Sequence, residues 1–206
     1  MRWSLSIAWW FMVLLAIAIG GYALSYFLIA EMGDPSFKIR YDAIPWSAKL
    51  HIIPAGVALI VGAFQFHPGL RRKWTGIHRN SGRAYVILVL IAAVGGLSLA
   101  WYAPHSPATR LGFASLAVIW FYATGMAFLS IRAGDVTRHR QWMVRSYALT
   151  LAAVTLRIQL PFYQAVLGLS FDDAYAIVAW FCWIPNLVVA EWFFNQEPIS
   201  KTAKSL

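Results

Sequence analysis

Six long apolar runs place the strongest limit on how this chain can fold. They cover residues 7–30, 48–66, 83–102, 111–131, 142–167 and 174–194. A helix needs about 20 mostly apolar residues to cross the hydrocarbon of a bilayer, where only the helix itself satisfies its backbone amides. We therefore expect an all-α, polytopic membrane protein with six transmembrane helices in one bundle, formed by a single domain over residues 1–206.

The composition agrees with a surface that faces lipid. Hydrophobic residues make up 60% of the chain and charged residues only 12%, whereas soluble proteins average about 25% charged residues. The net charge of +9 comes from basic residues gathered between the apolar runs. This distribution is typical of membrane orientation and disfavours nucleic-acid binding. The single cysteine excludes a disulfide framework and leaves histidine as the main soft metal ligand.

Lysine and arginine also predict the orientation. Twelve of them fall on one side of the predicted spans and four on the other, while Arg157 lies within a span. Because basic residues remain on the cytoplasmic side, both termini are expected in the cytoplasm. The arginine clusters on that side are expected to contact the lipid bilayer at anionic headgroups.

Among the polar residues inside predicted spans, four are candidates for a function, because an ionisable group there is costly and needs a partner or a purpose. They are His51, Arg157, Asn186 and Glu191. Pro185 is expected to break the last span, and Asn186 to bond the carbonyl that the break releases. For Glu191, an ion pair with Arg83, Arg145 or His139 competes with a role in proton transfer. For Arg157, snorkelling or an ion pair competes with ligand contact.

Histidines also collect at the cytoplasmic ends of the spans. His78 and His139 are expected at the same depth on different helices, as the two axial ligands of a six-coordinate haem iron require. Arg79 and Arg83 could neutralise haem propionates or bind a quinone headgroup. Tyr85 shares a helix face with His78, and His67 or Met143 could replace one of the two iron ligands. Alternatively, these arginines serve only orientation and lipid binding.

In the fifth predicted span, residues spaced three and four apart predict one continuous face from His139 to Arg157. It includes Met143, Ser146, Thr150 and Ala153. Small and hydroxylated side chains of this kind also favour close helix packing in membranes.

Several of these segments resemble a known family. They are HIIPAGVALIVGAFQF from His51, LRRKWTGIHRNSGRAY up to Tyr85, RHRQWMVRSYALT from Arg138, AAVTLR ending at Arg157, and WIPNLVVAE ending at Glu191. The chain is similar there to domain-of-unknown-function family 2306, a family of bacterial predicted membrane proteins. The resemblance implies a multi-pass protein of the bacterial cytoplasmic (inner) membrane and implies little about activity.

Three functions remain open from the residues alone. The leading hypothesis is a membrane electron-transfer protein that binds haem b at His78 and His139, or a quinone. The second is a transporter or proton-coupled carrier that uses the polar residues inside the spans and works as a homo-oligomer or through a pore between its helices. The third is an accessory subunit of a membrane complex. The electron-transfer hypothesis also requires a redox partner. The residues leave open whether the protein is an enzyme.

Overall fold

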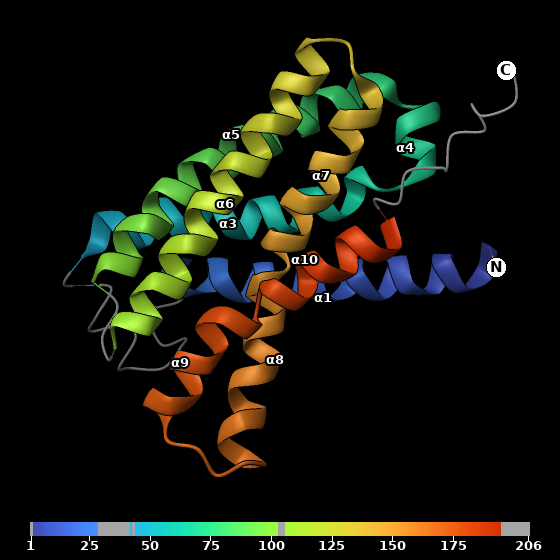
Figure 1. Ribbon diagram of the computed structural model, residues 1–206. Coiled ribbons are helices and arrows are strands. Elements are labelled where there is room, and N and C mark those ends of the chain that lie inside the picture. Colours follow the sequence, from blue (N-terminus) through green and yellow to red (C-terminus); the bar gives the residue numbers. More distant parts are fainter. Residues whose placement is uncertain (1, 29–41, 43, 103–105, 195–206) are drawn as a thin grey trace, which may run out of the picture.

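The computed structural model describes residues 2–28, 42, 44–102 and 106–194, and the elements of this part of the chain are all helices (Figure 1). The long helices are α1 (Arg2–Leu28), α3 (Pro45–Gln65), α5 (Thr75–Trp101) and α6 (Pro107–Arg132). The shorter ones are α4 (Pro68–Arg72), α7 (Val136–Thr150), α8 (Ala152–Ala165), α9 (Phe171–Phe181), α10 (Ile184–Val189) and the π-helix η1 (Ala190–Phe194). The expectation of an all-α protein is confirmed for the described residues.

Five segments among the described residues are long and apolar enough to cross a membrane. They are Ile7–Tyr26, Pro45–Gln65, Thr75–Trp101, Pro107–Arg132 and Phe171–Phe193. The run at 142–167 is not among them, because a turn at Leu151 divides it between α7 and α8, of 15 and 14 residues. The single unbroken helix that the predicted face from His139 to Arg157 assumed is therefore wrong, although Thr150, Ala153 and Arg157 of that face all line one cavity.

The third span begins earlier than its hydropathy predicts. Helix α5 starts at Thr75 rather than at residue 83, and the amide of His78 already donates to the carbonyl of Trp74, at 3.0 Å. Polar residues lower the hydropathy of this first part without interrupting its backbone hydrogen bonds, so hydropathy marks the apolar part and not the whole helix.

Capping side chains fix where three of the helices begin. Ser106, Asp135 and Ser170 cap α6, α7 and α9, each accepting a hydrogen bond from the backbone amide three residues later, as capping side chains do. Gly134 and Gly168 precede two of these caps with φ angles of +80° and +66°, a conformation that favours glycine. These turns allow α6 to pack on α7 and α8 on α9 (Figure 1).

The centre of the bundle is held by buried hydroxyl groups. The Tyr85 hydroxyl on α5 lies 2.9 Å from Ser146 Oγ and 2.9 Å from Thr150 Oγ1, both on α7. Helix α6 joins this network through Thr124 Oγ1, 2.7 Å from Ser146 Oγ, and through Trp120 Nε1, which donates to Thr150 Oγ1 at 3.0 Å. We call these five residues the hydroxyl network. Its hydrogen bonds link three helices without leaving a hydroxyl unpaired in the apolar core.

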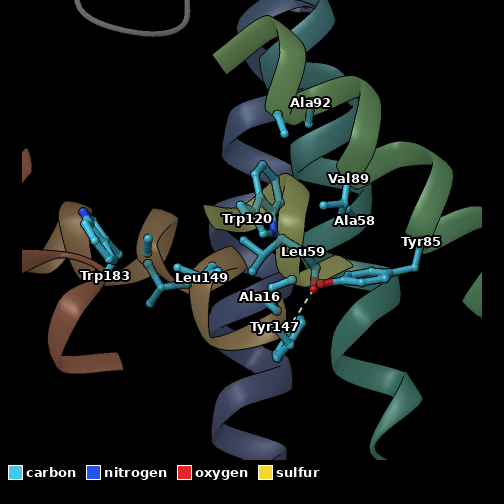
Figure 2. Close-up of a cluster of buried hydrophobic side chains, with 14 of the residues drawn as sticks. Ala16, Ala58, Leu59, Tyr85, Val89, Ala92, Trp120, Tyr147, Leu149 and Trp183 are labelled. Atoms are coloured by element: carbon cyan, nitrogen blue, oxygen red, sulfur yellow. Dashed lines mark hydrogen bonds between the residues drawn. The ribbon is translucent and has the colours of Figure 1, made fainter. Parts of the chain in front are cut away.

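Helix α3 is attached next to this network. Figure 2 shows Tyr85 pointing from α5 toward the centre, where Leu59, Trp120 and Tyr147 meet. The dashed line marks the hydrogen bond that the Tyr147 hydroxyl donates to the Leu59 carbonyl, at 3.0 Å. The Trp9 indole similarly ties α1 to α3 by donating to the Ala63 carbonyl, at 3.1 Å.

We expect Tyr85→Phe to lower the free energy of unfolding by about 1 kcal/mol, the scale of one or two interhelical hydrogen bonds in membrane proteins. The loss stays small because Ser146 and Thr150 keep other partners. Unfolding of the purified protein in mixed micelles measures it. Tyr122→Phe is the control, since that side chain is 56% exposed and stacks edge-on with Trp142. Equal losses in the two variants would contradict the structural role of the network.

Candidate ligand-binding cavity

A cavity of about 400 Å³ lies between α1, α3, α5, α6, α7, α8 and α9. Its walls are mostly apolar and aromatic, and the aromatic side chains are Tyr22, Tyr26, Tyr102, Phe113, Trp120 and Tyr175. The two basic side chains that line it are His51 and Arg157. Small-molecule sites in proteins have this size and this combination of apolar walls with a few polar groups. The structure therefore brings together two residues that are more than 100 positions apart in the sequence.

His51 is fixed in the cavity wall by α5. Its Nδ1 lies 2.8 Å from the carbonyl of Ala92. Because a carbonyl can only accept, Nδ1 carries the hydrogen, and the lone pair of the neutral ring is then on Nε2. No described residue hydrogen-bonds to Nε2. His51 thus offers an acceptor, or a metal-ligating nitrogen, to whatever occupies the cavity.

Two glycines of α5 make this arrangement possible. A Cβ on Gly95 would lie 2.6 Å from the backbone nitrogen of His51, and a Cβ on Gly96 would lie 2.8 Å from its Nδ1. Any larger residue would push α3 away from α5 and move the imidazole off the Ala92 carbonyl. Gly95 and Gly96 therefore allow α3 and α5 to approach closely enough to place His51 in the cavity wall.

Arg157 reaches the same cavity from α8. One guanidinium nitrogen donates to the Ala153 carbonyl at 2.9 Å, and the group lies over the Tyr22 ring of α1, 5.7 Å from its centroid. Its charge is within electrostatic range of the His51 ring. A guanidinium in this position can donate hydrogen bonds to a ligand oxygen or neutralise a ligand carboxylate.

The break in the last span lies against the same cavity. Pro185 has no amide hydrogen for the carbonyl of Phe181, and Gln159 Nε2 of α8 bonds that carbonyl instead, at 3.1 Å. Asn186 bonds the next carbonyl, that of Cys182, at 3.0 Å. The expected kink at Pro185 is confirmed, whereas the group that satisfies the Phe181 carbonyl was not expected. Interrupted helices at membrane depth are tolerated where they line a cavity, and Cys182 does line it.

Glu191 lies outside the cavity and forms an ion pair. Both of its oxygens accept from Arg145, at 2.5 and 2.8 Å, and that guanidinium stacks on Trp142. Of the three expected partners, the structure selects Arg145. Because the two side chains are 24% and 47% exposed, the pair lies at the surface of the bundle rather than in its core.

The histidines predicted at the cytoplasmic ends of the spans do not line the cavity. His139 Nδ1 lies 2.8 Å from the Ala127 carbonyl, which leaves its Nε2 with the lone pair when the ring is neutral. His78 is within electrostatic range of His139, and its Nδ1 is buried with no hydrogen-bond partner among the described residues. His67 stacks on Trp9 instead. The described residues contain no group of three or more potential metal ligands, although a haem iron needs only two.

The other predicted site residues have different surroundings. Tyr85 belongs to the hydroxyl network and is fully buried, while Arg79 and Arg83 are exposed. Basic residues of α4 and α7 lie close to one another. Burial and the neighbouring charges of Arg140 and Arg72 lower the pKa of Arg71. This accumulation of like charge is a surface that attracts anions.

Sequence reasoning missed the two aromatic residues that contact the basic side chains of the cavity. Trp120 contacts the His51 ring edge-on, with 6.4 Å between ring centroids, and Tyr22 contacts Arg157. Both reach the site from helices that no spacing rule connects with His51. In the sequence they look like ordinary aromatic residues of membrane helices, which are common there.

Comparisons with known proteins place the chain in a family but give no activity. No curated protein and no solved structure matches it. A family model described as "Predicted membrane protein (DUF2306)" matches residues 48–194, a segment that contains both His51 and Arg157. Because this match covers most of the chain, the protein belongs to the DUF2306 family of predicted membrane proteins.

Proposed function

We propose that this membrane protein takes part in electron transfer by binding a quinol in the cavity between His51 and Arg157. A quinol has a flat aromatic ring, two hydroxyl groups and an apolar tail. The aromatic walls suit the ring, and the two basic side chains suit its oxygens. A redox partner would accept the electrons, as membrane electron transfer requires.

The proposal rests on one observation, the hydrogen bond between His51 Nδ1 and the Ala92 carbonyl. It leaves a lone pair on Nε2, which can accept a hydrogen bond from a hydroxyl but can donate none to a carbonyl. The site is therefore better suited to the reduced form, whose ring oxygens carry hydrogen, than to the oxidised quinone. Arg157 can donate to either form, so His51 determines the preference.

We expect the purified protein to bind a short-tailed ubiquinol about tenfold more tightly than the matching ubiquinone, which corresponds to one well-placed hydrogen bond. His51→Asn is the decisive variant, because the asparagine amide can still donate to the Ala92 carbonyl but has no nitrogen at the Nε2 position. It should remain folded and lose the preference for the reduced form. Equilibrium dialysis with each redox form under argon measures both affinities.

The control for this measurement is His67→Asn, since His67 is exposed and does not line the cavity. It should bind both forms as the unchanged protein does. Equal affinity of the unchanged protein for quinol and quinone would contradict the role of His51, and absence of binding to either would contradict the proposed function.

A haem b held by His78 and His139 is the second candidate. The unpartnered Nδ1 of His78, the Nε2 lone pair of His139 and the arginines around them favour it. Imidazole nitrogens on two helices are suitable axial ligands, and arginines suit propionates.

If this haem is bound, the protein purified from cells supplied with iron and a haem precursor should show a Soret band that shifts on reduction with dithionite. The band should disappear in both His78→Ala and His139→Ala and persist in His51→Ala. A band that depends on His51 instead would place haem in the cavity, and the absence of any band would exclude this candidate.

We also infer six crossings in the cytoplasmic membrane of a bacterium, with α7 and α8 together forming the fifth and both termini in the cytoplasm. The arginines near α4 and α7 support this orientation, because basic residues stay on the cytoplasmic side. They would also contact anionic headgroups there.

Reporter fusions test the orientation. Green fluorescent protein fused after Leu206 should fluoresce, and alkaline phosphatase inserted between Tyr102 and Ser106 should be active, because the first folds in the cytoplasm and the second outside it. The reverse pattern, an inactive phosphatase with a dark C-terminal fusion, would contradict the orientation. An inactive phosphatase with a fluorescent C-terminal fusion, or an active phosphatase with a dark one, would place both points on the same side and contradict the count of six.

A further inference from the structure

Two interruptions in the helices lie against each other beside the cavity. One is the turn at Leu151 between α7 and α8, and the other lies between Phe181 and Ile184, where α9 gives way to α10. Asn186 contacts both interruptions. Its Nδ2 lies 3.2 Å from the carbonyl of Ala148 on α7, 3.0 Å from that of Cys182, and 3.0 Å from Thr155 Oγ1 on α8. One side chain therefore joins the segments on either side of the turn at Leu151.

Helix α8 is attached to the second interruption at two points. Thr155 bonds Asn186, and Gln159, one turn later, bonds the Phe181 carbonyl. Arg157 lies between these two positions in the chain and lines the cavity. Since Thr155 and Gln159 share one helix face, their hydrogen bonds fix both the direction and the rotation of α8. The rotation of α8 decides where the guanidinium of Arg157 lies.

His51 is fixed separately, by α5. The relative position of the two basic groups consequently depends on how α8 leaves α7, and that direction is held by the contacts of Asn186. A side chain that served only to pair free carbonyls could do so without bonding α7 and α8 at the same time.

We propose that Asn186 is a positioning residue for the ligand site: it holds α8 in the orientation that places Arg157 at the correct distance from His51. The inference rests on the proposed function, because quinol binding is its main measurement. It adds that ligand affinity is set by a residue that is not among those lining the cavity.

The test is a double-mutant cycle on the full chain in detergent, with the short-tailed ubiquinol as probe. Asn186→Leu has similar volume and should weaken binding about tenfold if Arg157 is displaced. In an Arg157→Gln background the same change should weaken binding by less than about twofold, because its effect passes through Arg157. Losses that simply add would overturn the proposal. Asn80→Leu, at an exposed position, is the matched control and should bind normally.

A second measurement does not depend on any ligand. Spin labels at Phe162 on α8 and Val94 on α5, which are 49% and 59% exposed, report the distance between the two walls in a Cys182→Ala background. Asn186→Leu should shift or broaden that distance distribution, and Asn80→Leu should not. An unchanged distribution would overturn the proposal. If Asn186→Leu does not fold, Asn186→Ser, which keeps a hydroxyl at the break, is judged by the same two criteria.

The two kinds of failure can be told apart. If the unchanged protein binds no ubiquinol, the proposed function fails, and the spin-label distances alone decide whether Asn186 orients α8. If the unchanged protein binds ubiquinol and Asn186→Leu binds equally well, the positioning role fails and the proposed function stands.

Discussion

The arrangement of this bundle depends on hydrogen bonds between hydroxyl groups in a place that water does not reach. Tyr85, Thr124 and Ser146 are fully buried, and Thr150 is 4% exposed. Two opposite orders of their hydrogens satisfy the whole network. In one order each hydroxyl donates toward Thr124, which itself donates to the carbonyl of Trp120. In the other order each donates toward Thr150, which donates to the carbonyl of Ser146. Neither order leaves a donor unpaired, so the helices can pack tightly without the cost of an unsatisfied polar group.

Two residues of the hydroxyl network also form part of the cavity wall. Trp120 and Thr150 belong both to the hydroxyl network and to the cavity wall. The wall formed by α6 and α7 is therefore held by side chains that already have partners, whereas His51 and Arg157 are placed by backbone carbonyls on α5 and α8. This division is typical of a binding site, in which a rigid scaffold holds the few polar groups that line it.

Much of the helical fold could be predicted from apolar runs, because length and hydropathy alone decide whether a segment can cross lipid. The turn at Leu151 could not, since no proline or glycine lies next to it and the one proline of that run, Pro161, lies ten residues further on, inside α8. For the site, the cost of burying His51 and Arg157 marked both residues as significant. Their meeting in one cavity depends on how α3 and α8 pack in three dimensions, and local spacing carries no information about that. The hydrogen bonds of Tyr85 with Ser146 and Thr150 could not be predicted either, because they join two helices.

Helix α1 precedes the segment that matches the family model, because that segment begins at residue 48. Yet it supplies one side of the cavity, including Gly20 and Tyr26, and the aromatic ring beneath Arg157. The basic groups and one part of the surface around them thus belong to separate parts of the chain. Two proteins that share the family segment but differ in their first helix would present the same chemistry to molecules of different outline, so exchanging that helix is a direct way to alter selectivity.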